Sequence, residues 1–555
     1  MGLFGRVSFL VIAFLSAAYS AYALSEYRAA WCISRARIII PKAVRRFHAS
    51  LKRNGLARNC SHSPDKRTAK DADKPVAVQP GAAAKFSTSA GWSAETGALS
   101  GSLSCPVAFV DNAAFESNVH AVVSLLLESK KQIRLSTKGV HCPELLERAA
   151  ALMERFSHPC SDYDIIAPGR LLVSGLLISN AAEALLWARR GTFPSLLLGE
   201  PVVDAVSAAN YVEAMTLNAT SKLRCLVVVD AVAQLELLWN AAKEWIFNGG
   251  YTRLGFDSAV ESLQFDLMLR GNLSDDAPWS PSPCGKGSQP LRGSCHVSQL
   301  CDMVKEFNAK VSSEKLPVGI QFVIRGLWTH EDGLLSGTDM APTPSHTTSC
   351  FIPARWCMRY PPLRWYKRHA AKQIQLRRCS MLEQLGYKKR PPPDEFLTSG
   401  GSSASLAYAA QDETLAEVCV AAGLLCGHHM DRYANSIFKP SLYFALAVTR
   451  VRPKRVLICS GFGHSLFGAV AVYPPQLRST QCHGTHVDED LEMGVMLSDG
   501  TSAEYFIGIG DPVVFRPKYS STLLELVDSL LLITEEGEVS ASMRTYRGEG
   551  WNIWA

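Results

Sequence analysis

The chain has 555 residues, of which 47% are hydrophobic and 19% charged, and its formal net charge at pH 7 is +6. This composition excludes a disordered or collagen-like chain, and the length exceeds that of one ordinary domain. The charge does not indicate a nucleic-acid-binding protein, because the basic residues gather between Arg28 and Lys70 and the remainder is close to neutral or slightly acidic.

An apolar run from Val7 to Leu24 lies near the N-terminus, and small residues close to its end would permit cleavage. Its length suits the hydrophobic region of a signal peptide and is marginal for a membrane span. The dense positive charge after it, with only Arg6 before it, favours a signal anchor whose catalytic part faces the cytosol. An Arg-rich leader equally suits a mitochondrial presequence. Residues 1–49 are therefore predicted to be a signal anchor or a targeting leader, and the compartment stays open.

The 16 cysteines are scattered singly, without a CxxC pair or a Cys/His spacing typical of zinc. Several lie inside apolar runs, as Cys225, Cys419 and Cys459 do, where cysteine behaves as a small hydrophobic residue. This usage favours a reducing compartment over a disulfide-bonded scaffold.

Residues 50–104 are rich in Ala, Ser, Lys and Gly without apolar periodicity, which predicts a disordered linker. From Cys105 onward, short apolar runs alternate with amphipathic segments, as in "PVAFVD" followed by "NAAFESNVHAVVSLLLES". Such alternation indicates parallel strands covered by helices. More than five units favour a closed (β/α)8 barrel of the TIM type over residues 105–438, and an open doubly wound sheet is the alternative.

Two Pro/Ser/Gly-rich stretches, near 272–295 and 332–360, interrupt the alternation and are predicted loop insertions. From about Lys439 the helical pattern fades, and strand-like runs separated by turn residues predict a smaller, mostly antiparallel β domain over residues 439–555. The expected fold is thus α/β, with a barrel followed by a β domain behind an N-terminal hydrophobic leader.

A lysine, Lys138, follows the second predicted strand in "IRLSTK". Active sites of barrels lie at the C-terminal ends of the strands, and a partly desolvated lysine there can act as an amine nucleophile. The alternative is an ordinary solvated lysine at a strand end.

A Gly/Ser loop, "LTSGGSSASL" from Leu397 to Leu406, comes late in the barrel, roughly where barrels often bind phosphate. Its glycines would let backbone N–H groups approach an anion, and its serines would add hydroxyl donors. By composition a flexible linker is the stronger interpretation. The candidate anion-binding residues are Gly400, Gly401, Ser402, Ser403 and Ser405.

Two further positions are candidates because of their place in the fold. His330, beside Glu331, comes just past the end of a buried strand, where an imidazole could move protons near neutral pH. Tyr433 and Asp431 precede the β domain, and junctions between domains often hold sites. A structural histidine and a packing tyrosine are the corresponding alternatives.

The order of these motifs resembles fold-type III pyridoxal-phosphate (PLP) enzymes, and more narrowly the D-serine dehydratase-like and D-threonine aldolase-like group with an alanine-racemase-type N-terminal barrel. "CPVAFVDNAAFESNV" is similar to that family's opening strand, with Asp111 and Asn118 at characteristic places. "IRLSTKG", "GLWTHEDG" and "TSGGSSASL" follow in the family's order, and the C-terminal end resembles its amino-acid-deaminase branch. The resemblance runs from about Cys105 to Trp551, less the two insertions.

The resemblance implies that Lys138 carries PLP as a Schiff base and acts as a base once released. It implies that Gly400, Gly401 and the three serines bind the cofactor phosphate, with Tyr433 also on the cofactor, and that His330 is catalytic. The expected activity is that of a lyase or deaminase on a D-amino acid with a β-hydroxyl, giving a keto acid and ammonia. A homodimer is the family's usual assembly.

One departure concerns the metal. Family members that use a divalent metal carry a His-x-Cys or His-x-Asp pair, and Tyr519 and Ser521 stand at the matching positions here. Neither is a good zinc ligand, and His483 and His486 more plausibly belong to a surface loop, so no metal site is predicted. Retro-aldol cleavage, racemisation and a non-catalytic PLP-binding protein remain alternatives.

Overall fold

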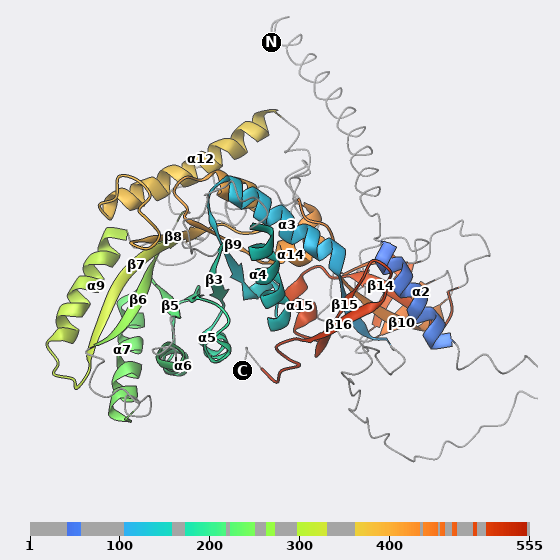
Figure 1. Cartoon of the computed structure of the whole chain (residues 1–555), viewed down its shortest axis with the longest axis horizontal. Helices are drawn as coiled ribbons and strands as arrows, with labels where there is room; N and C mark the ends of the chain where they lie inside the picture. The colour runs from blue at the N-terminus through green and yellow to red at the C-terminus, as the bar shows by residue number, and fades with distance from the viewer. Residues whose placement is uncertain are drawn as a thin grey trace, which may run out of the picture.

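The chain is described from a computed structural model, which places residues 42–56, 105–157, 172–217, 223–249, 262–271, 273, 297–329, 361–432, 437–452, 456–460, 469–473, 492–496 and 507–551. The predicted leader as far as residue 41, nearly all of the insertion near 272–295, and the whole of 332–360 lie outside these described residues. Among the described helices, none is long and apolar enough to cross a membrane. The described part consists of a barrel and a second sheet, which lie at opposite ends of the molecule (Figure 1).

Eight parallel strands form the closed barrel, which confirms the predicted fold class and excludes the open sheet. The barrel closes where the first strand pairs with the last, from Gln132↔Glu417 to Leu135↔Val420. The strands are β2 (Gln132–Ser136), β3 (Val173–Ile178), β4 (Ser195–Leu198), β5 (Arg224–Val229), β6 (Ser262–Gly271), β7 (Gly319–Thr329), β8 (Leu397–Gly400) and β9 (Glu417–Val420).

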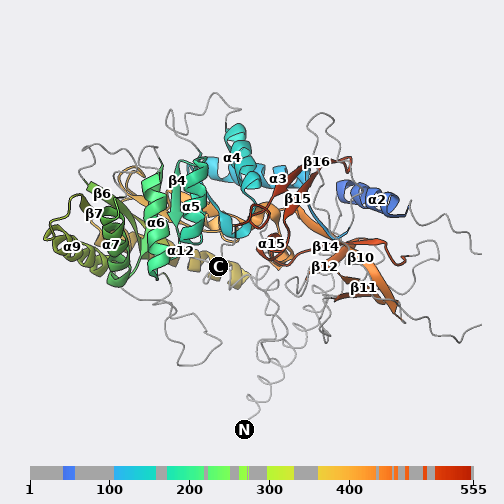
Figure 2. The ribbon, with the colours of Figure 1, turned by 90° about the horizontal axis from the view of Figure 1, so that it is seen from below.

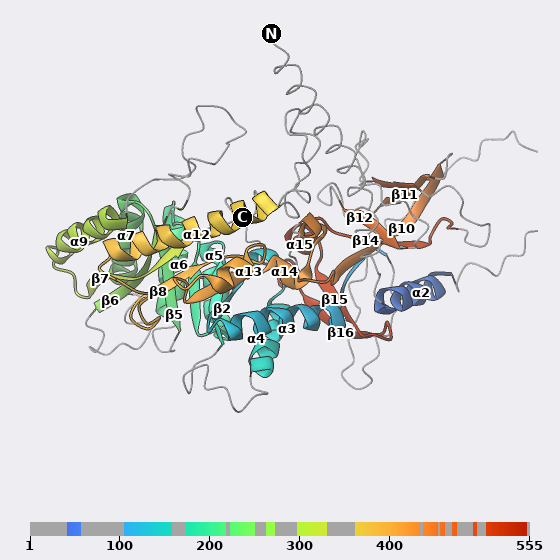
Figure 3. The ribbon, with the colours of Figure 1, turned by 90° about the horizontal axis from the view of Figure 1, so that it is seen from above.

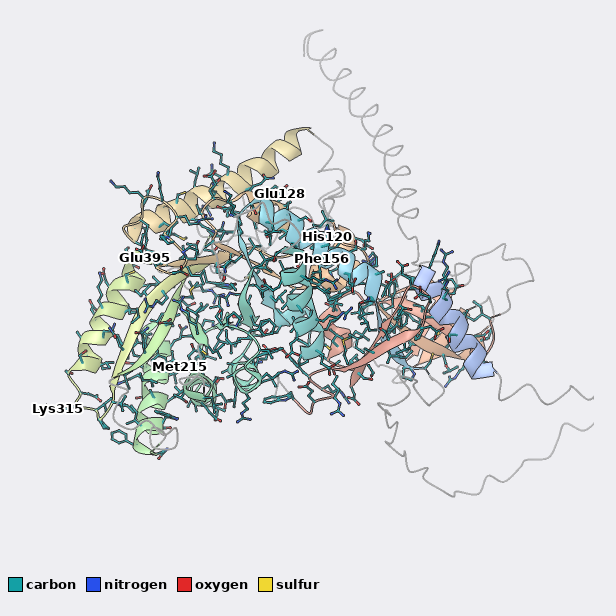
Figure 4. The ribbon with its side chains drawn as sticks, viewed as in Figure 1. His120, Glu128, Phe156, Met215, Lys315 and Glu395 are labelled. Carbon is teal, nitrogen blue, oxygen red and sulfur yellow. The ribbon has the colours of Figure 1, made fainter. Side chains whose placement is uncertain are left out.

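Helices cover the outside of the barrel, as Figure 2 shows for the row α5, α6, α7 and α9. Their apolar faces join the main core, and neighbouring helices also contact each other: His120 of α3 and Phe156 of α4 meet edge to face with ring centroids 5.3 Å apart (Figure 4). These helices are α3 (Asn112–Glu128), α4 (Pro143–Ser157), α5 (Ala181–Arg190), α6 (Ala205–Leu217), α7 (Val232–Phe247), α9 (Val297–Ser312), α12 (Pro361–Gln384) and α13 (Leu406–Gln411).

A buried ion pair lies among the barrel strands. Arg134 donates from Nε to Glu417 Oε1 at 2.5 Å and from Nη2 to Oε2 at 3.0 Å, and both side chains are fully buried. Ser174 Oγ also donates to Glu417 Oε2 at 2.6 Å. Burial alone would raise the pKa of Glu417, but Arg134 and hydrogen bonds from serine side chains lower it below its usual value. The pair joins the first barrel strand to the last.

Replacing one partner of this pair is expected to destabilise the fold strongly. Arg134→Met leaves a buried, uncompensated carboxylate, so the free energy of unfolding from chemical denaturation should fall by roughly 3–5 kcal/mol. The double variant Arg134→Met/Glu417→Leu removes both charges and should recover much of that loss. Equal stability of the single variant and the wild type would contradict the role assigned to the pair.

The second sheet has the order β12-β14-β10-β1-β15-β16, with β11 and β13 continuing from β10. It is antiparallel except where β1 runs parallel to β15, which agrees with the prediction of a mostly antiparallel β domain. Its strands are β1 (Val107–Asp111), β10 (Leu442–Arg452), β11 (Val456–Ser460), β12 (Val470–Tyr473), β13 (Glu492–Met496), β14 (Pro512–Arg516), β15 (Ser529–Ile533) and β16 (Val539–Arg544).

The position of β1 differs from the expectation that the barrel begins at residue 105. β1 pairs with β10 and β15 and therefore belongs to the second sheet, so β2 is the first strand of the barrel. The strand is nearly all buried, and the helix α3 follows it directly, which is the pattern of a barrel unit. That local pattern does not reveal which sheet a buried strand joins.

Helix α2 (Lys42–Leu56) also differs from the expectation, because it crosses the predicted boundary between leader and linker at residue 49. Its buried residues Ala43, Val44 and Phe47 pack against the second sheet, and the rings of Phe47 and Phe109 lie 4.7 Å apart. Gly537 permits this close approach, since a Cβ atom there would lie 2.6 Å from Phe47 N. Figures 1 and 3 place α2 beside this sheet, away from α7 and α9.

Helix α2 is therefore part of the folded unit, and its loss should destabilise the protein. Phe47→Ala is expected to lower the free energy of unfolding by about 3 kcal/mol, because a fully buried aromatic ring is removed. Arg45→Ala, on the exposed face of the same helix, is the matched control and should change it by less than about 0.5 kcal/mol. Equal effects of the two substitutions would show that α2 does not contribute to the core.

Candidate active site

Lys138 lies in a single 3-10 turn, η1 (Thr137–Gly139), which directly follows β2 at the C-terminal end of the barrel. Its neighbours Thr137 and Gly139 are buried, whereas Lys138 is exposed. The predicted position at the C-terminal end of a strand is therefore observed, and that strand is the first of the barrel. An exposed side chain on a buried turn leaves the amine accessible while the backbone beneath it is held in place.

The Lys138 turn packs against two other segments on its Gly139 side. A Cβ atom on Gly139 would lie 2.7 Å from Ala422 N and 2.9 Å from Ala421 Cβ, so only glycine fits against the residues that follow β9. From the β domain, Ser520 Oγ donates to Gly139 O at 2.7 Å. Ser520 begins the short helix α15 (Ser520–Leu524). The turn is thus fixed by the last barrel strand and by the second domain together.

The first four residues of the predicted Gly/Ser loop form β8, and the rest of the loop, 401–405, follows that strand at the same end of the barrel and is ordered by hydrogen bonds of its own. Ser402 N donates to Ser405 Oγ at 3.0 Å, and Ser405 N donates to Ser402 O at 3.1 Å. Gly401 has a positive φ of 75°, and a Cβ atom there would lie 2.8 Å from Ala409 Cβ. These contacts order the loop as a turn, which excludes the flexible-linker interpretation.

The loop and the Lys138 turn meet through one intermediate segment. Ser403 Oγ accepts a hydrogen bond from Ala421 N at 3.0 Å, and Ala421 packs on Gly139. Ser403 and Ser405 are buried and use their hydroxyls within the protein, while Gly401 and Ser402 are half-buried. Because the Ser402 N–H already donates to Ser405 Oγ, the half-buried backbone of Gly401 is the part of the loop best able to meet an anion.

His330 and Tyr433 lie outside the described residues, and their roles stay predictions. Asp431, the neighbouring candidate, accepts hydrogen bonds from Arg516 Nη1 at 2.8 Å and pairs with His428 Nδ1 at 3.3 Å. Burial tends to raise the pKa of Asp431, but His428 and Arg516 lower it below its ordinary value. Asp431 thus acts as the counter-charge of the buried Arg516.

Tyr519 and Ser521, where the resemblance would put a metal pair, are next to the Lys138 turn, since Ser520 stands between them and bonds to Gly139. Tyr519 is partly exposed, and its ring lies 4.9 Å from that of His429. Within the described part of the chain, no group of three or more His, Cys, Asp or Glu side chains is arranged to hold a metal ion. His483 and His486 are outside that part.

One buried histidine near the site was not anticipated from the sequence. His141, three residues after Lys138, stacks on Tyr546 with ring centroids 5.5 Å apart. Burial lowers the pKa of His141 from 6.5 to about 4, so its 3.5 Å contact with Glu525 Oε1 is not an ion pair at neutral pH. The stretch "VHCP" gives no periodic signal that would have revealed a buried imidazole.

His141 should make the protein sensitive to acid. Between pH 6.5 and about 4 the unfolded chain binds a proton that the folded chain does not, so stability falls as the pH falls through this window. The full effect is ~3 kcal/mol. His141→Phe should flatten the dependence of the unfolding free energy on pH, and the exposed His120→Gln should leave it unchanged. An unaltered slope in His141→Phe would refute this assignment.

No family model matches the sequence, and no curated protein matches it either. Solved structures do match. D-threonine aldolase from Filomicrobium marinum superposes with a TM-score of 0.53 at 15% identity, over 80% of this chain and 96% of that one. D-threo-3-hydroxyaspartate dehydratase from Delftia sp. HT23 superposes with a TM-score of 0.51 at 13% identity, over 80% and 97%. This likeness confirms the predicted fold, a barrel with a β domain.

Proposed function

We propose that this protein is a PLP-dependent lyase, with Lys138 as the residue that holds the cofactor covalently. The observation that supports this most is the exposed Lys138 on a buried turn, joined through Ala421 to an ordered Gly/Ser loop. A lysine amine and a glycine-containing turn that can accept a phosphate are the two anchors that PLP requires. The residues present therefore fit the cofactor.

The roles of the chain's own residues follow from this arrangement. The Lys138 amine would bond to the cofactor aldehyde, and the backbone of Gly401 would meet the phosphate, with Gly400, Ser402, Ser403 and Ser405 shaping the loop. When bound, PLP supplies an electron sink for negative charge that develops at the substrate α-carbon. Lys138, once displaced by the substrate amine, would be free to accept the α-proton. His330 and Tyr433 are proposed to complete the site.

The proposed substrate is a D-amino acid with a β-hydroxyl, and the proposed products are a keto acid and ammonia. The two solved structures reported above support the substrate class, because their names describe enzymes that act on D-threonine and on D-threo-3-hydroxyaspartate. Retro-aldol cleavage and racemisation are the rival reactions. Product analysis separates the reactions. Retro-aldol cleavage gives glycine and an aldehyde, and racemisation gives the mirror-image amino acid. PLP binding without turnover would indicate a non-catalytic protein.

We propose further that no metal binds at the family's usual positions, because a phenol and a hydroxyl, from Tyr519 and Ser521, stand there. Homodimer formation is also proposed. It is the usual assembly of the enzymes that the sequence resembles.

The cofactor assignment predicts a clear result for Lys138→Ala. The wild-type chain purified with PLP should show a visible absorption band of bound cofactor, and the variant should lose that band and all turnover of D-serine and D-threonine, because the amine proposed to anchor the cofactor is removed. The exposed Lys305→Ala on α9 is the matched control and should keep both. Full turnover by Lys138→Ala would overturn the proposal.

A further inference from the structure

A carboxyl group that the proposed reaction does not use lies directly behind the Lys138 turn. Glu183, in the first turn of α5, has no exposed surface. Its Oε2 atom accepts a hydrogen bond from Thr137 Oγ1 at 3.0 Å and another from Ser179 N at 2.6 Å. Thr137 is the residue before Lys138 and is itself fully buried. Glu183 therefore holds the side chain that precedes the candidate cofactor lysine.

The groups in contact with this carboxyl are uncharged in the described part of the chain. Besides the Thr137 hydroxyl and the Ser179 amide on Oε2, the Tyr546 hydroxyl lies near enough to affect the pKa of this carboxyl, while Glu183 Oε1 is buried without a hydrogen-bond partner. Tyr546 Oη in turn accepts a hydrogen bond from Trp187 Nε1 at 2.9 Å. A buried carboxylate without a cation is costly, because its desolvation is not offset. Burial accordingly raises the pKa of Glu183, and the hydrogen bonds only partly oppose this.

The C-terminal segment that carries Tyr546 contacts the barrel part of the chain at two positions. Tyr546 N donates to His141 O at 3.0 Å, and Arg190, at the end of α5, pairs with Glu549 at 3.0 Å. The tyrosine thus contacts the chain after Lys138 through its backbone and the Glu183 carboxyl through its hydroxyl.

We infer that Glu183 is a positioning residue that acts as a neutral hydrogen-bonding group, fixing Thr137 and with it the orientation of Lys138, and linking both to Tyr546 of the β domain. The inference rests on the proposed function in one respect, namely that Lys138 carries the cofactor. A neutral group suits the task, because it orders the turn without a buried, uncompensated charge behind it.

The test uses the full chain with two pairs of variants. Glu183→Gln keeps a neutral acceptor for Thr137 and Ser179, whereas Glu183→Ala removes both hydrogen bonds. Thr137→Ser keeps the hydroxyl, and Thr137→Val removes it at constant shape. The Thr137 pair keeps the test decisive if Glu183→Ala does not fold. Exposed Glu213→Ala on α6 is the surface control.

Two quantities are measured on each variant. The first is the dissociation constant for PLP, from titration of the visible absorption, and the second is amide hydrogen exchange of the peptide that spans 136–141 in the cofactor-free protein. In Glu183→Ala and Thr137→Val, PLP binding should weaken by about tenfold and exchange should accelerate. Glu183→Gln, Thr137→Ser and Glu213→Ala should stay within about twofold of the wild type.

The outcomes separate the inference from the proposed function. If Glu183→Gln behaves like Glu183→Ala, a charged carboxylate is required, and the inference is overturned. If Thr137→Val changes neither quantity, the link to Lys138 is absent. If the wild type does not bind PLP, the proposed function fails, and hydrogen exchange in the cofactor-free protein still decides whether Glu183 and Thr137 hold the turn.

Discussion

Pairing of β2 with β9 closes the barrel, and the candidate site depends on that closure. Parallel strands bring their C-terminal ends to one face, so the residue after the first strand meets the residues after the last. Here Gly139 packs on Ala421, which also binds Ser403 of the Gly/Ser loop. In an open sheet the first and last strands would be far apart, and Lys138 would have no Gly/Ser loop beside it. The buried pair of Arg134 with its partner on β9 stabilises the same junction.

The second domain takes part in holding the turn, although its sheet lies at the other end of the molecule (Figure 1). Ser520 contacts Gly139, and Tyr546 contacts His141, so the β domain contacts the chain on the far side of Lys138. Tyr546 also meets Glu183, which holds Thr137 on the near side. The lysine side chain is therefore exposed on a backbone with very little freedom. Such preorganisation is what a covalent anchor for a cofactor requires.

The alternation of strands and helices, the β domain and the strand-end position of Lys138 were predictable because they depend on local periodicity. The sheet that β1 joins was not predictable, because a buried strand followed by a helix has the same local pattern whether it belongs to the barrel or to the second sheet. Helix α2 was assigned to the leader and linker because its basic residues continue the charge of the leader, while its few buried residues pack on strands far away in the sequence. Asn180 caps α5, so Glu183, three residues later, looks in the sequence like an ordinary acidic residue of a first helical turn. Its position beside Thr137 and Tyr546 depends on tertiary structure, which the local sequence does not reveal.

The most direct test of this account is to reduce the full-length protein with borohydride in the presence of PLP and to map the modified peptide. Reduction fixes the cofactor to the amine that carries it. We expect a single pyridoxyl group on Lys138, because its amine is exposed at the barrel mouth while the turn beneath it is buried. A label on another lysine, or no label, would contradict the account and leave Lys138 as an ordinary residue at a strand end.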